Sequence, residues 1–327
     1  MIQRNAASRP GRSVETRRLG PEEVEAAAAI LRAGGLVAIP TETVYGLAAD
    51  ARQGRAVARV FEAKGRPRFN PLIVHVADAE AAFALGRAGE DARRLAAAFW
   101  PGPLTLLLPL REESGLSDLV SAGTGHVGLR VPAHPVAGAL LRAVGGPLAA
   151  PSANPSGRIS ATSAEHALAG LGGRIEAVLD GGPCAVGVES SIVALAGDAA
   201  RLLRPGGVPQ EALESALGRP LARGGEGFAA PGQMASHYAP RGAVRLDATE
   251  PRPGERMLGF GPVEGDLTLS PSGDLREAAA NLFATLHALD ALGGPIAVAP
   301  IPDRGLGRAI RDRLARAAAP RPEAKGS

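Results

Sequence analysis

Short apolar runs alternate with polar or glycine-rich loops along this chain, a pattern typical of α/β proteins. The run over residues 36–39 ends at Pro40, which cannot extend a strand ladder because it has no amide donor. A polar loop over residues 41–46, a helical pattern and a second apolar run over residues 72–74 follow. We therefore predict strand, loop, helix, basic loop and strand over residues 34–76.

The same pattern predicts the remaining elements. One helix is expected to begin with a capping box of Thr162 and Glu165, and another with Asp274 and Glu277. Further helices are expected over residues 21–33, 78–99 and from residue 308. Strands are expected over or near residues 104–108, 129–131, 147–151, 178–180, 187–193, 202–204 and 296–299.

Length and composition indicate a globular protein of about two domains, since the chain has 327 residues and 45% of them are hydrophobic. We predict an unstructured tail over residues 1–17, a first α/β domain over residues 18–221 and a linker rich in glycine, alanine and proline over residues 222–242. A smaller domain over residues 243–318 and a tail over residues 319–327 follow. The strand, glycine loop and helix of the smaller domain indicate a Rossmann-like α/β unit, with a structural role for its glycines.

Composition also excludes several classes of protein. A single cysteine, Cys184, rules out an internal disulfide and a cysteine-based zinc site. The six histidines form no HExxH motif and no tight pair, so we predict no metal site. The formal net charge of +3 favours a small anionic ligand over a dedicated polyanion partner. Because no apolar run of about 20 residues occurs, we expect a cytoplasmic protein without membrane contact.

Basic side chains follow the helix predicted within residues 34–76, at Lys64, Arg66 and Arg68. Of the 36 basic residues only Lys64 and Lys325 are lysines, so Lys64 stands out in a chain that otherwise uses arginine. A compact ammonium group binds phosphates or carboxylates as a point charge. A cation at a helix carboxyl end is also favoured by the helix dipole alone. Lys64 by itself leaves both readings open, and the neighbouring polar loop favours an anion pocket.

Hydroxyl, amide and cationic side chains recur at the ends of several predicted strands, a recurrence that indicates one shared anion-binding cavity. Arg130, at a strand end among apolar neighbours, is either paired with a core acid or directed at a ligand carboxylate, and the sequence leaves this open. The segment 123–128 matches GxGxxG, but a strand pattern ending at Pro132 follows it instead of a helix. We therefore assign it no nucleotide.

Ordered motifs then point to a family. They are PTETVYGL, KGRPRFNPLIVHV, WPGPLT, LRVPAHP, APSANPSG, GVESSIV, LLRPGG and APGQMASHYAP. In this order and spacing they closely resemble the L-threonylcarbamoyladenylate synthases, in the long form that joins a YrdC-like domain to a C-terminal domain. The resemblance covers about residues 18–318 and implies a twisted sheet around a large, positively charged cavity.

The resemblance implies a nucleotidyltransferase that converts L-threonine, bicarbonate or CO2 and ATP into threonylcarbamoyl-AMP, pyrophosphate and water. The product would serve the threonylcarbamoyladenosine modification of tRNA next to the anticodon. The implied partners are downstream tRNA threonylcarbamoyl-transfer proteins, with indirect or weak contact to tRNA itself. Mg2+ would be carried by the ATP substrate.

Carried onto this sequence, the resemblance implies three groups of site residues. The L-threonine-binding group is Thr41, His75, Arg130 and Ser190. The ATP-binding group is Lys64, Arg66, Asn70, Ser152, Asn154, Ser160 and Arg204, of which Lys64 and Arg66 are the catalytic residues. A lid over the occupied site would contain Gln233, His237 and Tyr238.

Two alternative functions agree less well with the sequence. A carbamoyl-adenylate-forming module, as in hydrogenase-maturation carbamoyltransferases, would be accompanied by zinc-finger cysteines and an acylphosphatase portion, which this sequence lacks. An RNA-binding module without chemistry would use a broad basic surface and stacking aromatics. Aromatic residues make up only 3% of the chain, which disfavours that reading.

Overall fold

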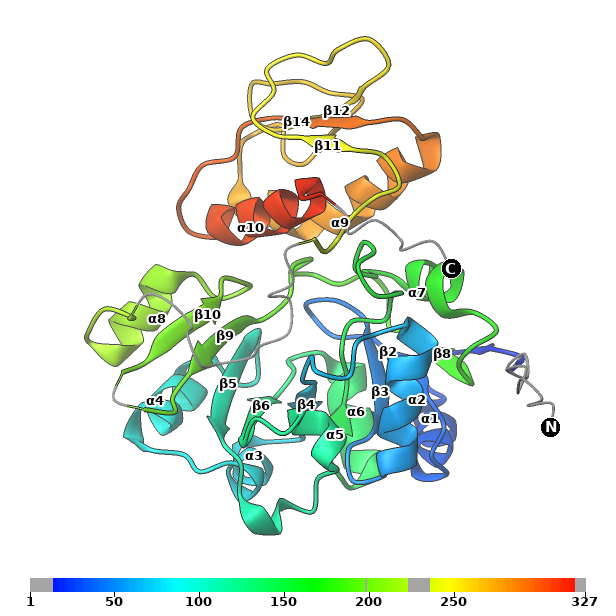
Figure 1. The fold of residues 1–327 in the computed structure, drawn as a ribbon, viewed down its shortest axis with the longest axis vertical. Helices are drawn as coiled ribbons and strands as arrows, with labels where there is room; N and C mark the ends of the chain where they lie inside the picture. The colour runs from blue at the N-terminus through cyan, green and yellow to red at the C-terminus, as the bar shows by residue number, and fades with distance from the viewer. Residues whose placement is uncertain (1–13, 198, 223–235, 321–327) are drawn as a thin grey trace, which may run out of the picture.

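The larger of two α/β domains is built on a ten-stranded mixed sheet (Figure 1). The structure is a computed structural model that describes residues 14–197, 199–222 and 236–320. In spatial order the strands of the large sheet are β1 (Arg17–Leu19), β8 (Ala177–Leu179), β2 (Val37–Ile39), β3 (Gly46–Asp50), β7 (Leu148–Ala149), β4 (Ile73–His75), β6 (His126–Arg130), β5 (Leu104–Pro109), β9 (Ser191–Ala194) and β10 (Arg201–Arg204).

Helices connect these strands and cover the sheet. Those of the first domain are α1 (Val24–Arg32), α2 (Gly54–Lys64), α3 (Ala79–Leu85), α4 (Glu90–Phe99), α5 (Asp118–Ser121), α6 (Pro135–Val144), α7 (Ala164–Leu171) and α8 (Gln210–Leu217), with a 3-10 turn η1 (Glu112–Ser114). The predicted apolar face of α2 is buried, and the helix ends at Gly65 in the left-handed conformation, with φ of 60°. The basic loop begins after this glycine.

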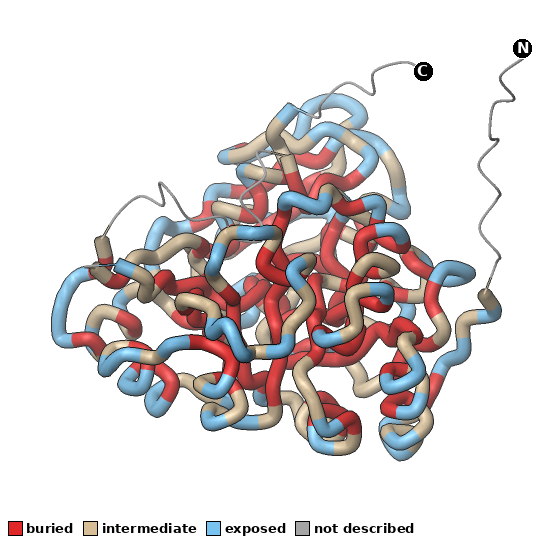
Figure 2. Tube along the Cα trace, turned by 60° about the horizontal axis from the view of Figure 1, so that its bottom comes forward, coloured by how far each residue is buried: buried red, intermediate tan, exposed pale blue. Residues whose placement is uncertain are grey.

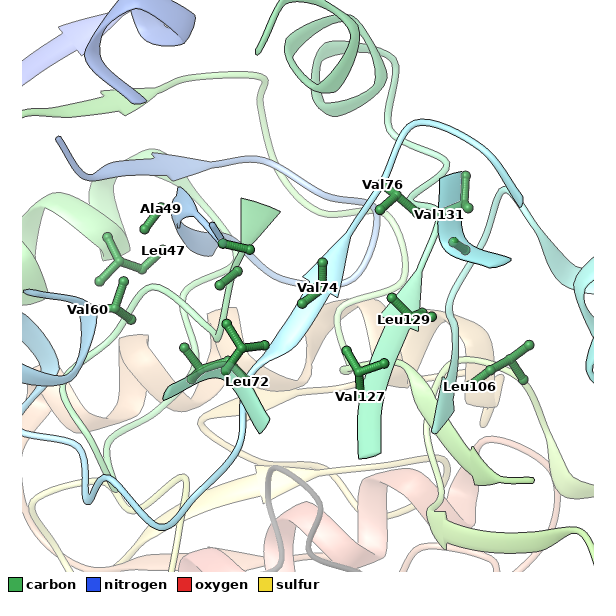
Figure 3. Close-up of a cluster of buried hydrophobic side chains, with 14 of the residues drawn as sticks. Leu47, Ala49, Val60, Leu72, Val74, Val76, Leu106, Val127, Leu129 and Val131 are labelled. Carbon is green, nitrogen blue, oxygen red and sulfur yellow. The ribbon is translucent and has the colours of Figure 1, made fainter. Parts of the chain in front are cut away.

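Strand alternation separates the core from the polar side chains of β4 and β6. Figure 3 shows Val74 of β4 and Leu129 of β6 in one apolar cluster, and both are fully buried. Successive side chains of a strand point to opposite faces, so His75 and Arg130 lie on the other face. The parallel pairing of β4 with β6 places His75 directly opposite Arg130. The core thus brings together two of the predicted site residues.

The prediction misses one strand between the loop after β2 and helix α2. The chain turns at residues 41–45 and returns as β3, which pairs antiparallel with β2. Every residue of β3 is buried, so the strand shows no alternation of polar and apolar positions. The predicted helix over residues 78–99 is also wrong, because Gly86 divides it into α3 and α4. A Cβ on Gly86 would lie 2.8 Å from Leu129, and its backbone bridges to Leu110.

Smaller corrections concern the first tail and two helix caps. The tail is shorter than predicted, because Arg17 opens β1 and Thr16 donates from its hydroxyl to the Ile175 carbonyl at 2.6 Å. Ser163, not Thr162, caps α7. Asp274 caps its helix as predicted, whereas the Glu277 carboxylate accepts a hydrogen bond from the Ser270 hydroxyl instead of completing a capping box.

The second domain contains four parallel strands and two helices, which agrees with the Rossmann-like prediction. In spatial order its strands are β11 (Val244–Arg245), β14 (Ile296–Val298), β12 (Arg256–Gly259) and β13 (Leu267–Thr268). Its helices, α9 (Leu275–Leu292) and α10 (Gly307–Ala318), lie between this sheet and the first domain (Figure 1). Gly307 serves packing, since a Cβ there would lie 1.9 Å from the Pro302 carbonyl oxygen.

Buried residues run along the strands of the sheets, and exposed residues occupy the outer turns (Figure 2). The segment 123–128 leads into β6 and no helix follows it, as the sequence predicts. In the described part of the chain, no helix combines the length and the apolar character that crossing a membrane requires.

Candidate active site

One cavity collects most of the side chains that the sequence predicts as site residues. It encloses about 540 Å³ of space not occupied by protein atoms, its opening included. The predicted residues that line it are Thr41, Arg66, His75, Arg130, Ser152, Ser190, Arg204, His237 and Tyr238. These side chains come from loops and strands that are distant in sequence. The polar strand ends therefore do meet in a single cavity.

Lys64 lies behind the wall of the cavity. Its buried ammonium group donates to the carbonyl oxygen of Ser152 at 2.5 Å and also to that of Asn154. Burial, together with the positive charge of Arg66, lowers the pKa of Lys64 well below its usual value. In this arrangement Lys64 fixes the loop that carries Ser152 instead of facing the cavity.

Three more predicted residues surround the cavity without lining it. The Asn154 side-chain amide donates to the carbonyl oxygens of Pro155 and Arg158, both at 2.9 Å, and its buried Oδ1 has no partner within the described residues. Ser160 donates to Glu189 at 2.6 Å. Asn70 is buried after the basic loop. Gln233 lies outside the described residues.

Arg130, in the lining of the cavity, is held by several partners. Its guanidinium donates to Glu42 at 2.7 Å, to the Thr43 hydroxyl at 2.8 Å and to the Gly102 carbonyl at 3.3 Å. The arginine and glutamate side chains are almost fully buried. The first alternative for Arg130, a pair with a core acid, is therefore confirmed. Arg130 also lines the cavity, and its contact with a ligand carboxylate stays a prediction.

His75 beside Arg130 carries an open hydrogen-bonding atom. Its ring is buried, and its Nδ1 has no partner within the described residues. Burial, and then the charge of Arg130, lowers the pKa of His75 to about 3. The imidazole is therefore neutral at physiological pH. A buried polar atom without a partner is costly, so a ligand group that bonds this nitrogen would gain affinity.

Arg204 and Ser190, which both line the cavity, form a connected pair. Arg204 donates from Nε and Nη2 to the Ser190 carbonyl at 3.1 and 2.9 Å, and from Nη2 to its hydroxyl at 3.1 Å. The Ser190 hydroxyl is also hydrogen-bonded to the buried Thr105 hydroxyl, 2.7 Å away. Arg66 donates to the Pro71 carbonyl at 3.0 Å. Burial lowers the pKa of Arg66 to about 10, so it keeps its charge at neutral pH.

Sequence reasoning did not assign the acids Glu42 and Glu189, or Arg313, which is the ionic partner of Glu189. Glu189 lines the cavity, and its Oε2 accepts from Arg313 of α10 at 2.8 Å. The sequence could have indicated both acids, because Glu42 lies between two hydroxyl residues of the predicted loop and Glu189 directly precedes Ser190. Arg313 could also have been found, because it is a charged residue on the otherwise apolar face of α10 that contains Ile310.

The charges of the lining suit an anionic ligand. Over the described ranges, three guanidinium groups and one carboxylate line the cavity, and the carboxylate is paired with an arginine. Guanidinium groups bind carboxylates and phosphates through paired hydrogen bonds. No cluster of three or more histidine, cysteine, aspartate or glutamate side chains suited to a metal ion occurs in the part of the chain that the structure describes.

The twisted α/β sheet with this cavity, joined to a second α/β domain, places the protein in the YrdC-like class of two-domain proteins. The family model described as "Telomere recombination", for Sua5, YciO and YrdC, matches residues 29–206. The model described as the C-terminal domain of threonylcarbamoyl-AMP synthase matches residues 208–319. The chain belongs to the threonylcarbamoyl-AMP synthase family, as its sequence motifs predict.

Individual relatives cover nearly the whole chain. Threonylcarbamoyl-AMP synthase of Bacillus subtilis is 41% identical over 322 residues, which span 90% of this chain and 93% of the relative. The enzyme of Pyrococcus abyssi is 39% identical over 320 residues, spanning 90% and 94%. The crystal structure of P. abyssi Sua5 complexed with L-threonine superposes with a TM-score of 0.84 at 37% identity, covering 93% of this chain and 97% of that one.

Proposed function

We propose that this protein forms threonylcarbamoyl-AMP from L-threonine, bicarbonate or CO2 and ATP, with release of pyrophosphate and water. The observation that carries the proposal is the gathering of polar and cationic side chains from separate loops in one cavity, in a chain that resembles named synthases along most of its length. The residue roles below belong to the same proposal.

L-Threonine is assigned to the end of the cavity that contains Arg130. Its carboxylate would bind the guanidinium of Arg130, which Glu42 and Thr43 hold in one orientation. The open Nδ1 of His75 would accept or donate a hydrogen bond with the substrate. Thr41 and Ser190 complete the proposed group. A relative of known structure was determined with L-threonine, which supports the assignment.

ATP is assigned to the remaining cations and hydroxyl groups, and we propose that they make this a positively charged cavity. Arg66 and Arg204 would neutralise the phosphates, and Ser152 would hydrogen-bond to the nucleotide. Lys64 would act by fixing the loop that bears Ser152, at the position its hydrogen bonds show. Asn70, Asn154 and Ser160 would support the nucleotide from behind the lining.

The chemistry requires proximity more than covalent catalysis. The threonine amine adds to CO2 or bicarbonate to give a carbamate, with loss of water when bicarbonate is used. A carbamate oxygen then attacks the α-phosphorus of ATP, and the bond to pyrophosphate breaks. Arginines that hold two anions side by side lower the barrier by removing their repulsion and fixing their orientation.

Water must be excluded while the carbamate exists, because carbamates decompose in water. His237 and Tyr238 are buried and line the cavity, so we assign them to a lid. Gln233 belongs to the same proposed lid and lies outside the described residues. Burial lowers the pKa of His237 to about 3, so this ring is neutral and leaves the cationic groups as the charge carriers.

Mg2+ is proposed to arrive with ATP. The one carboxylate in the described lining, Glu189, is already bonded to Arg313 and Ser160, so the protein would offer the ion few ligands. We further propose a cytoplasmic place of action and transfer of the product to tRNA threonylcarbamoyl-transfer proteins, with indirect or weak tRNA contact.

The test supplies ATP, Mg2+ and bicarbonate together with each proteinogenic amino acid in turn, and measures pyrophosphate and any acyl-adenylate formed. We expect pyrophosphate release with L-threonine, accompanied by threonylcarbamoyl-AMP. Release without threonine, or with carbamoyl phosphate in its place, would refute the assignment and favour a carbamoyl-adenylate-forming enzyme. RNA binding without any turnover would favour an RNA-binding module.

A further inference from the structure

The last helix of the second domain reaches the wall of the cavity in the first. α10 lies on the side of the second domain that faces the first (Figure 1). Its Arg313 is fully buried and donates from Nε to Oε2 of Glu189 at 2.8 Å. The Nη1 of the same side chain donates to the backbone oxygen of Pro205 at 2.6 Å. One side chain of the second domain thus joins two loops of the cavity, since Arg204 precedes Pro205.

Glu189 is held from its other side by the first domain. Its Oε1 accepts a hydrogen bond from the Ser160 hydroxyl at 2.6 Å, so each carboxylate oxygen has a partner from a different domain. Burial alone would raise the pKa of Glu189, but Arg313, Arg204 and the Ser160 hydroxyl hold it below its usual value. Glu189 is therefore ionised at neutral pH.

An ionised carboxylate in the wall of an anion-binding cavity repels the phosphates that the cavity receives. Glu189 is the one carboxylate of the lining in the described ranges, whereas Arg313 is not a lining residue. The contacts of Arg313 that bear on the cavity therefore run through Glu189 and the backbone of Pro205. It neutralises Glu189 and fixes the orientation of its carboxylate.

The same helix also holds the described end of the linker. The Arg313 guanidinium carbon lies 5.5 Å from the centre of the Tyr238 ring, within the range of a cation–π contact. The backbone amide of His237 donates to the Arg316 carbonyl at 3.1 Å. His237 and Tyr238 line the cavity, so α10 contacts the lining both at Glu189 and at the end of the linker.

We propose that Arg313 is a positioning residue of the active site, through which the second domain completes the nucleotide end of the cavity. Its guanidinium keeps Glu189 neutralised and oriented toward Ser160, and it supports Tyr238 over the same end. This proposal rests on the proposed function, because it takes ATP as the anion received there.

The test compares three variants of the full-length chain by calorimetric titration with ATP and with L-threonine. In Arg313→Met a side chain of similar length loses its charge, and Glu189 is left unpaired. We expect the Kd for ATP to rise at least about tenfold, because the loss of one partner leaves a buried charge uncompensated. The Kd for L-threonine is expected to stay within about threefold of wild type. Ser190 follows Glu189 in the chain, but its hydroxyl is bonded to Arg204 and Thr105 and not to this pair.

A second variant separates charge from packing. In Glu189→Gln/Arg313→Met the unpaired charge is removed, and the amide oxygen still accepts from Ser160. We expect this double variant to bind ATP more tightly than Arg313→Met alone, and a further loss of affinity would overturn the electrostatic role.

If Arg313→Met does not fold, Arg313→Lys takes its place. A rise of more than about threefold in its Kd for ATP supports the proposal, and an unchanged Kd overturns it.

The matched control is Arg308→Met, on the same helix. Arg308 pairs across the domains with Glu211 at 3.0 Å, but its side chain is about one-third exposed. Removing a partly exposed pair is expected to change the Kd for ATP by less than about threefold. Equal effects of the two methionine variants would overturn the proposal. A wild-type chain that binds neither ATP nor L-threonine would instead refute the proposed function.

Discussion

Two buried arginine–glutamate pairs each contribute one residue to the lining of the cavity, and they differ in how they are assembled. Arg130 pairs with Glu42 at 2.7 Å inside the first domain, where strand register and one loop bring them together. Arg313 pairs with Glu189 at 2.8 Å across the two domains. Each pair also has a hydroxyl neighbour, Thr43 in the first case and Ser160 in the second.

On the proposed assignment, the difference means that the two substrates would be bound by different parts of the fold. The proposed L-threonine end is complete within the large sheet, since both members of its pair belong to the first domain. The proposed ATP end is closed by a helix of the second domain. The second domain thus has a direct role at the site in addition to its own packing.

Removal of the lining residue Arg66 is expected to have the largest effect on turnover. Arg66→Ala eliminates a lining guanidinium that would neutralise the phosphates, and should lower kcat/KM about 100- to 1,000-fold. Its matched control is Arg68→Ala, an exposed position in the same loop, which should remain near wild type. Pyrophosphate release measures both. Near-full activity of Arg66→Ala would contradict the assignment of the cavity.

Breaking the intradomain pair should mainly cost stability. Arg130→Met leaves the buried Glu42 carboxylate without its ionic partner, which should lower the free energy of unfolding by about 3 to 5 kcal/mol. The double variant Glu42→Gln/Arg130→Met should recover part of that loss, because no unpaired charge remains. Urea denaturation gives both values. Equal stability of the single variant and wild type would show that the pair is not coupled to folding.

The neutral histidine next to Arg130 should make stability depend on pH. His75 has a pKa of about 3 in the folded protein, whereas an unfolded histidine titrates near pH 6.5. Between these values the unfolded chain binds the proton and the folded one does not, so stability falls as the pH is lowered, by about 1.4 kcal/mol per pH unit. His75→Gln should reduce this slope by that amount. Denaturation at a series of pH values tests it, and identical slopes would contradict it.

The smallest effect is expected from a buried hydroxyl behind Ser190. Thr105→Val removes the 2.7 Å hydrogen bond to the Ser190 hydroxyl, which keeps its bond from Arg204. The loss should be about 1 kcal/mol, or about fivefold in KM for L-threonine. Steady-state kinetics at saturating ATP measure it. A change in KM for ATP alone would show that Ser190 belongs to the nucleotide end.

The sequence predicted the parts of the site that local pattern determines. The apolar run over residues 72–74 and the strand pattern that ends at Pro132 place His75 and Arg130 at strand ends, and proline or glycine after a strand marks the loops that meet at the cavity. The order and spacing of the motifs indicated the family and the site residues that membership of it implies. In contrast, β3 was missed, because a strand buried on both faces shows no alternation.

Long-range geometry was beyond sequence reasoning. Lys64 was singled out as one of two lysines in a chain that otherwise uses arginine, but its local sequence does not reveal whether it faces a ligand or the carbonyls of Ser152 and Asn154. The partner of Glu189 lies 124 residues further along the chain, in another domain. Only the packing of the two domains determines that Arg313 meets it.

The most direct test of a cavity with two separate ends is the pair of affinities of Ser160→Ala, measured calorimetrically with ATP and with L-threonine. Ser160 donates to Glu189 and belongs to the proposed nucleotide end. We expect weaker ATP binding and unchanged L-threonine binding. Equal weakening of both ligands, or weakening of L-threonine alone, would contradict the division of the cavity into a threonine end and a nucleotide end.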